Sequence, residues 1–198
     1  MVIKNSYEIL QTLLKDISKR HTVTSLSKER DISRVGSWKL FKDLEKENLI
    51  LLNPIGSEKT SVLEVSLNWN NPLLEKTLAL LLTEDALKQS KWRYNFKELE
   101  NHVDFLILFG SILHSPKEAN DIDILSLVSN EESFVKIGKI ITDIQITQNK
   151  KIHSINLTNK ELKHEIKDKN KSYTEALKKG IVLFGQENFI KFIRETSK

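Results

Sequence analysis

The chain has 198 residues, of which 39% are hydrophobic and 29% are charged, and its formal net charge is +4. This composition is typical of a folded globular protein, and the length is compatible with one domain or two. Cysteine is absent, which excludes disulfide bonds, thiolate-metal sites and cysteine nucleophiles. The sequence shows no secretory leader and no apolar run of the ~20 residues that span a membrane, so we expect a cytoplasmic protein without a membrane partner.

The first 48 residues predict three helices. Apolar residues recur at helical spacing from about Asn5 to Arg20, and Thr22 or Thr24 can cap a second, short helix that follows. Ser33 can cap a third helix that ends near Asn48. In that third helix, apolar residues recur every three positions, at Val35, Trp38, Phe41 and Leu44.

Two β-type runs, at residues 49–52 and 61–65, follow the helices and are separated by a turn that contains Pro54 and Gly56. Three helices followed by a hairpin resemble a winged helix-turn-helix domain, here over residues 1–68. In that family the third helix enters the DNA major groove and the hairpin wing contacts the backbone or the minor groove. The resemblance implies DNA contacts by Arg34, Ser37, Lys39, Lys42, Ser57 and Lys59. Residues 1–66 contain eleven Lys and Arg against nine Asp and Glu, which is weakly basic for a DNA-binding domain, so a protein-protein or dimerisation role is the alternative.

Residues 69–93 then predict a helical linker, in which Pro72 fits the first helical position and a leucine-rich stretch follows. That stretch can pack on either domain or support a homodimer. Its heptads are not sustained, which favours domain packing.

Two segments carry the chemistry of the remaining residues. The apolar run 104–109 predicts a strand buried on both faces, and it leads into Gly110 and Ser111. Gly110 can adopt backbone conformations closed to other residues, and Ser111 can open a helix whose free N–H groups favour phosphate. Ten residues later, Asp121 and Asp123 lie about 7 Å apart on one face of a second strand. Two carboxylates this close repel each other, so their placement is best explained by a divalent cation such as Mg²⁺, which would offset the repulsion and also bind substrate phosphates.

Phe109-Gly110-Ser111, followed by Asp121-Ile122-Asp123, resembles the signature of the DNA polymerase beta superfamily in its minimal nucleotidyltransferase branch. The resemblance implies an α/β domain over residues 94–198, with a small mixed sheet flanked by helices, so that the whole chain is α+β. It also implies that Gly110 and Ser111 hold the triphosphate of an NTP and that Asp121 and Asp123 hold Mg²⁺. A nucleotidyl group would then pass to a protein or RNA acceptor. A winged helix ahead of such a domain is an arrangement associated with archaeal proteins.

The sequence departs from the family pattern at two places. His114-Ser115 stands where many relatives have Arg-Gly, so His114 could still donate a hydrogen bond to a phosphate of the nucleotide, but without the bidentate contact that Arg makes. The third carboxylate of active members has no counterpart, because the next β-type run, residues 151–157, contains no acid. His153 or Asn156 could replace it as a weak ligand, but packing or solvent contact is the simpler interpretation of either. Two hypotheses follow, an active transferase and a catalytically impaired, nucleotide-binding transcriptional regulator.

Overall fold

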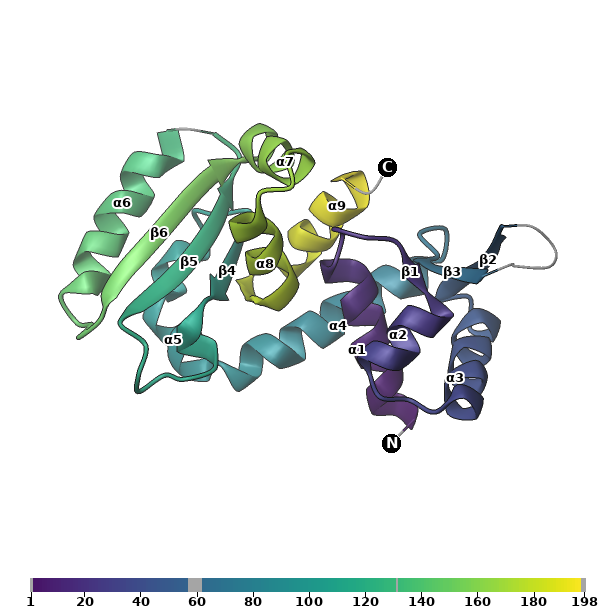
Figure 1. Ribbon diagram of the computed structural model, residues 1–198. Helices are drawn as coiled ribbons and strands as arrows, with labels where there is room; N and C mark the ends of the chain where they lie inside the picture. The colour runs from purple at the N-terminus through teal and green to yellow at the C-terminus, as the bar shows by residue number, and fades with distance from the viewer. Residues whose placement is uncertain (1, 57–61, 131, 197–198) are drawn as a thin grey trace. The chain divides into compact units, whose positions relative to one another are not determined.

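A computed structural model describes residues 2–56, 62–130 and 132–196 (Figure 1). The chain divides into two compact units, residues 1–81 and 82–198. Each unit contains its own β-sheet. Within the described ranges, none of the helices is both long enough and apolar enough to cross a membrane.

The first unit combines helices with a small antiparallel sheet. Its elements are α1 (Val2–Lys15), β1 (His21–Thr22), α2 (Val23–Glu29), α3 (Arg34–Lys46), β2 (Ile50–Ile55) and β3 (Val62–Leu67). The strand order is β1-β3-β2, and both pairings are antiparallel. A long helix, α4 (Pro72–Lys88), follows and contains the point at which the two units divide.

The predicted helix caps are present in this unit. Thr22 caps α2 through a capping box with Ser25, and the Ser33 side chain accepts a hydrogen bond from the N–H of Gly36 at the start of α3. These bonds satisfy N–H groups that have no partner within their helices. The short polar residues before each apolar run therefore fix where both helices begin.

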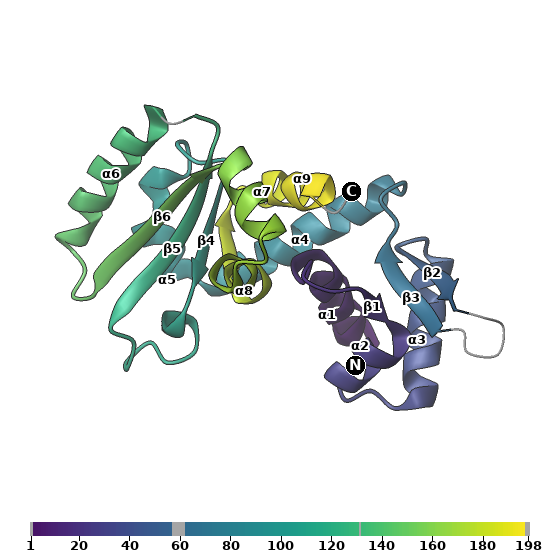
Figure 2. The same cartoon turned by 45° about the horizontal axis from the view of Figure 1, so that its top comes forward.

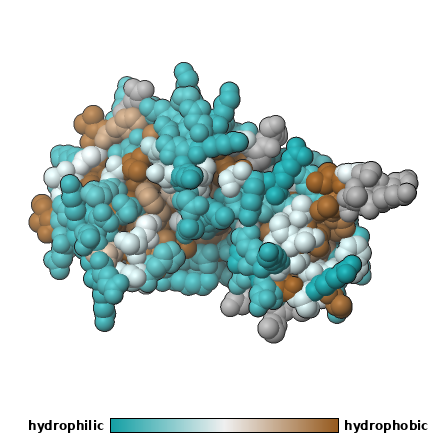
Figure 3. All heavy atoms as spheres, in the orientation of Figure 1, coloured by the Kyte–Doolittle hydropathy of each residue, from teal (hydrophilic) through white to brown (hydrophobic). Residues whose placement is uncertain are grey.

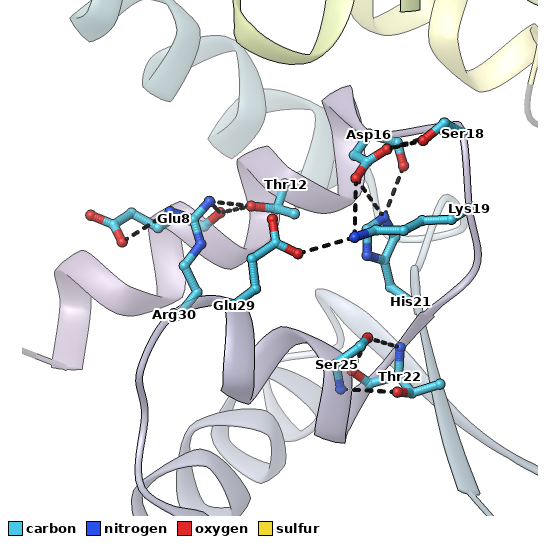
Figure 4. A network of polar contacts seen from close by, with 10 residues as sticks. All are labelled: Glu8, Thr12, Asp16, Ser18, Lys19, His21, Thr22, Ser25, Glu29 and Arg30. Atoms are coloured by element: carbon cyan, nitrogen blue, oxygen red, sulfur yellow. Dashed lines mark hydrogen bonds and ion pairs between the residues drawn. The ribbon is translucent and has the colours of Figure 1, made fainter. Parts of the chain in front are cut away.

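Helix α1 ends at Lys15 rather than near the predicted Arg20. Figure 4 shows the cause, because the buried Asp16 side chain accepts a hydrogen bond of 2.5 Å from the Ser18 hydroxyl, which favours a turn over a further helical turn. His21 Nε2 donates to the Asp16 carbonyl oxygen at 2.8 Å, and so ties the start of β1 to the end of α1. Lys19 adds ion pairs to Asp16 and to Glu29 of α2.

The face of α3 that packs inward does not follow the three-residue apolar repeat of its sequence. Val35 and Trp38 are 82% and 50% exposed. The buried residues of α3 are Ser37, Leu40, Phe41 and Leu44. A strict three-residue spacing turns back by about 60° at each step around an α-helix, so Val35 and Leu44 lie on opposite sides. The inward stripe follows the usual i, i+3, i+4, i+7 pattern instead.

The second unit is built on a mixed four-stranded sheet. Its elements are α5 (Ser90–Asn95), the 3₁₀ turn η1 (Lys97–Leu99), β4 (Phe105–Phe109), the 3₁₀ turn η2 (Ser111–Leu113), β5 (Asp121–Val128), α6 (Glu132–Gln145), β6 (Lys151–Thr158), α7 (Asn159–Lys167), α8 (Lys171–Lys179), β7 (Ile181–Phe184) and α9 (Gln186–Thr196). The strand order is β6-β5-β4-β7, in which β5 and β6 are parallel and the other pairs are antiparallel. The predicted fold class, α+β with a mixed sheet in the second part, is confirmed.

Helices cover both faces of this sheet. Figures 1 and 2 show α6 on one side of the strands and α8 on the other. On the α6 side, Ile137 packs with Leu108 and Ile124 in one buried cluster. On the other side, Phe105 of β4 meets Phe189 of α9 edge to face, with ring centroids 5.3 Å apart. The central strands are therefore buried on both faces, and polar side chains on them are exposed only near the strand ends.

Candidate metal and nucleotide site

The turn after β4 is in close contact with the start of β5. The antiparallel register pairs Phe109 with Asp123, and Gly110 follows directly. Gly110 has φ 82° and ψ −164°, a conformation that essentially only glycine adopts. A Cβ atom at this position would lie 2.2 Å from Oδ2 of Asp123. Glycine is therefore required here both by the backbone conformation and by the neighbouring carboxylate.

Three side chains that can bind a metal gather on one face of the sheet. Asp121 and Asp123 face the same way because strand residues alternate between the two faces. The parallel register pairs Asp123 with His153 of β6. His153 Nδ1 lies 3.3 Å from Asp121 Oδ2 and 3.5 Å from Asp123 Oδ1. One potential ligand atom from each of the three residues falls within 4.8 Å of the other two.

The carboxylate pair carries an electrostatic cost. Burial raises the pKa of the Asp123 carboxyl above its ordinary value of 3.8, and the neighbouring Asp121 carboxylate raises it further. His153 acts in the opposite direction. The side chains of Asp121 and Asp123 keep 32% and 25% of their area exposed, so an ion from solvent can reach their oxygens. Two partly desolvated oxygen donors in repulsion fit a hard divalent cation such as Mg²⁺.

The predicted phosphate-binding residues occupy the turn beside this cluster. Ser111 is exposed and begins η2, which is a three-residue 3₁₀ turn rather than the α-helix expected there. Such a short element provides little of the helix dipole on which the phosphate argument rested. His114, at the end of η2, is also exposed and is not one of the three clustered residues.

His153 is the site residue that the sequence interpretation underrated. Packing or solvent contact was the simpler expectation and weak metal ligation the alternative. The structure leaves the side chain 46% exposed and places its Nδ1 beside both carboxylates. The sequence feature that could have indicated His153 is the alternation of side chains along β6, which puts Lys151, His153 and Ile155 on one face. Among the residues that the structure describes, no third carboxylate joins the pair, and the imidazole occupies the adjacent position.

Of the candidate DNA-binding residues of the first unit that the structure describes, three are exposed and one is buried. Arg34, Lys39 and Lys42 are exposed, and Lys42 pairs with Glu45 at 2.7 Å. Ser37 is buried and its hydroxyl donates to the carbonyl oxygen of Arg34, so it does not face solvent as predicted. Ser57 and Lys59 of the expected wing lie outside the described residues.

An apolar groove of about 910 Å³ runs between α2 and α3 of this unit. Val35 and Trp38 contribute exposed apolar surface to it, with Lys28 and Arg34 beside them. In the space-filling view, hydrophobic residues form separate brown patches among hydrophilic ones (Figure 3). The exposed surface of α3 therefore mixes apolar and basic side chains.

Comparison with known proteins identifies a family for part of the second unit. Residues 95–188 match the family described as "Polymerase beta, Nucleotidyltransferase". The match contains the four strands of the mixed sheet, the Gly110 turn and the Asp121, Asp123 and His153 cluster. These residues therefore form a polymerase-beta-type nucleotidyltransferase domain, and for them the predicted resemblance to the polymerase beta superfamily is confirmed. No significant match was found among curated proteins or among solved structures.

Proposed function

We propose that the protein is an Mg²⁺-dependent nucleotidyltransferase that moves a nucleotidyl group from an NTP to a protein or RNA acceptor. The proposal assigns residues 94–198 to the transferase, 69–93 to a helical linker and 1–68 to a DNA-binding winged helix. The observation that carries it is the contact between Gly110 and Asp123, with Asp121 on the same face, within a domain of the nucleotidyltransferase family.

In the proposed reaction, a hydroxyl oxygen of the acceptor forms a bond to the α-phosphorus of the NTP. The bond from that phosphorus to the oxygen bridging to the β-phosphate breaks, and pyrophosphate leaves. Bound Mg²⁺ would supply charge neutralisation on the phosphates and lower the pKa of the attacking hydroxyl. Asp121 and Asp123 would hold it, while Gly110 leaves room for the phosphates to approach the backbone.

The hydroxyl proton would pass to solvent in this scheme, because no third carboxylate accompanies the pair among the described residues. A general base at that position is worth roughly 10²–10⁴ in rate. We therefore expect slow turnover. The same observation supports a second candidate function, a nucleotide-binding transcriptional regulator in which catalysis is impaired.

Titration calorimetry with ATP, GTP, CTP and UTP in the presence of Mg²⁺ tests the shared premise of both candidates. We expect wild-type protein to bind at least one NTP and the double variant Asp121→Ala/Asp123→Ala to lose that binding. Asp143→Ala, which removes an exposed carboxylate from α6, is the matched control and should bind like wild type. Equal binding by wild type and the double variant would contradict the metal-nucleotide assignment.

Incubation with α-labelled NTPs and cell extract separates the two candidates. Label on a protein or RNA acceptor, lost in the double variant, supports the transferase. Nucleotide binding without any labelled acceptor supports the regulator instead.

We also propose that the first unit binds DNA as a winged helix. The supporting observation is the order of three helices and two strands, with the short β1 completing a β1-β3-β2 sheet. Arg34, Lys39 and Lys42 are exposed on α3, whereas the buried Ser37 is no longer a candidate. The exposed groove beside Trp38 keeps a protein-binding role as the alternative.

A mobility-shift assay at low salt tests DNA binding. We expect Arg34→Ala and Lys39→Ala each to weaken binding and to lower the salt dependence by about one phosphate contact. Lys167→Ala, at an exposed position of α7 in the other unit, is the charge-matched control. No affinity of the wild-type protein for any DNA tested at low salt would contradict the proposal.

A further inference from the structure

We propose that His153 is the third protein ligand of the metal centre, through Nδ1, and that it gives this centre a preference for a first-row transition-metal dication such as Mn²⁺ over Mg²⁺. The inference rests on the proposed metal-binding role of Asp121 and Asp123. It adds to that role a ligand that is not a carboxylate and a different order of metal affinities, in which Mg²⁺ still binds but more weakly than Mn²⁺.

The position of His153 is set by the sheet rather than by a flexible loop. β5 and β6 are paired in parallel from Asp121 and Lys151 to Val128 and Thr158, and Asp123 faces His153 within this continuous register. Neighbouring strands are separated by about 4.8 Å, so side chains on the same face at paired positions are adjacent. The imidazole is therefore held beside the carboxylates by eight consecutive residue pairs.

The distances suit a shared ion. Ligand atoms about 2.1 Å from one metal ion and at right angles to each other lie roughly 3 Å apart. The two Nδ1-to-oxygen distances of 3.3 and 3.5 Å are already close to this value. One donor atom from each residue lies within 4.8 Å of the other two, so rotations that bring the side chains closer together would place all three donor atoms on one ion. The His153 side chain is 46% exposed, which leaves a solvent-facing side for water or phosphate oxygens to complete the coordination.

The donor set decides the metal preference. Mg²⁺ takes almost only oxygen ligands and gives up its water reluctantly. Imidazole nitrogen suits first-row transition metals, and two carboxylates with one imidazole form a mixed nitrogen and oxygen set. Mn²⁺ is the weakest nitrogen binder of that series and accepts oxygen ligands as well, so it is the stringent case for a preference over Mg²⁺. Replacing a carboxylate by His153 removes one negative charge and one oxygen donor, and both changes disfavour Mg²⁺.

The competing explanation is that His153 only balances charge, with Nδ1–H donating to the two carboxylates. The two explanations predict opposite effects of removing the imidazole. A charge-balancing group competes with a cation, so its removal would raise metal affinity. A ligand stabilises the bound ion, so its removal lowers metal affinity.

Calorimetric titration of the full chain with Mn²⁺ and with Mg²⁺, without nucleotide, measures this difference. We expect wild type to bind Mn²⁺ at least about tenfold more tightly than Mg²⁺. Removing a group that only supports a metal ligand typically lowers metal affinity by roughly 10–100-fold. Because His153 is proposed to be a ligand itself, His153→Ala should lower Mn²⁺ affinity by at least this factor. His153→Asp should shift the preference towards Mg²⁺. His164→Ala, which removes a histidine that is 72% exposed on α7, is the matched control and should behave like wild type.

Pulsed electron paramagnetic resonance of the Mn²⁺-loaded protein gives a second readout that does not depend on activity. We expect ¹⁴N coupling from a directly coordinated imidazole in wild type and in His164→Ala, and none in His153→Ala. Unchanged or increased Mn²⁺ affinity in a folded His153→Ala variant, or no ¹⁴N coupling in wild type, would overturn the inference.

The double variant Asp121→Ala/Asp123→Ala separates this inference from the proposed function. If that variant binds Mn²⁺ like wild type, the site itself is wrong and both proposals fail. If it loses Mn²⁺ while His153→Ala keeps it, only the role of His153 is wrong.

Discussion

Replacing Gly110 by alanine should destabilise the second unit and disable the metal site together. The backbone at Gly110 has φ 82° and ψ −164°, where a residue with a Cβ atom costs about 1–3 kcal/mol. The new Cβ would also lie 2.2 Å from Asp123 Oδ2 and 3.2 Å from Asp123 Cγ. The carboxylate can avoid this clash by rotating away, at a cost of about 0.5–1.5 kcal/mol if it leaves its preferred rotamer.

We therefore expect Gly110→Ala to lower the free energy of unfolding by about 1.5–4.5 kcal/mol in metal-free buffer, the sum of these two costs. In an Asp123→Ala background the clash is absent, so the same substitution should cost only the backbone part, about 1–3 kcal/mol. The coupling between the two positions is then about 1 kcal/mol. Divalent-cation binding should be lost in Gly110→Ala, because the rotated Asp123 no longer faces Asp121.

Urea denaturation followed by circular dichroism measures the four proteins of this cycle, and calorimetry measures their cation binding. Gly138→Ala is the matched control, because a Cβ atom there meets nothing within 4 Å on helix α6. That control should raise stability by about 0.4–1 kcal/mol. If Gly110→Ala unfolds at the same urea concentration as wild type and binds cations equally well, the contact between Gly110 and Asp123 is wrong.

Two further predictions concern Asp123 and the cap of α2. The raised pKa of Asp123 means that the folded protein holds this proton more tightly than the unfolded chain, so stability should fall as pH rises above 3.8 through the folded pKa. In EDTA, wild type should therefore lose stability relative to Asp123→Asn over this range, and a constant difference between the two would argue against the shift. Thr22→Ala removes the capping box of α2 and should cost about 1 kcal/mol in urea denaturation, whereas the exposed Thr24→Ala should have little effect. Equal losses of stability in Thr22→Ala and Thr24→Ala would show that Thr22 is not the residue that caps α2.

Local sequence determined much of this protein. Ser33 precedes an amphipathic run and caps α3, and the two-residue alternation of β5 places Asp121 and Asp123 on one face. The order of the Gly110 turn and the carboxylate pair was enough to indicate the nucleotidyltransferase family, which residues 95–188 match. The helix cap and the shared face of the two carboxylates depend on residues within a few positions of each other, so periodicity and capping chemistry are sufficient to predict them. The family was indicated by resemblance to a known signature.

Some local expectations failed where a second element decides the outcome. Val35 and Trp38 belong to the three-residue apolar repeat of the sequence but are exposed, and the inward stripe of α3 includes Ser37 and Leu40 instead. Helix α1 stops at Lys15, where the buried Asp16 meets His21 of β1. The partner that buries a helix face or ends a helix is not encoded in that helix alone.

Only the tertiary structure assembled the complete candidate site. His153 is thirty residues from Asp123 in sequence, and the two meet because β5 and β6 pair in parallel with one particular register. A shift of that register by a single residue would turn His153 to the opposite face of the sheet. Sequence alternation predicted that two carboxylates share a face. Which side chain stands beside them was decided by strand pairing, a long-range property that the packing of both faces of the sheet holds in place.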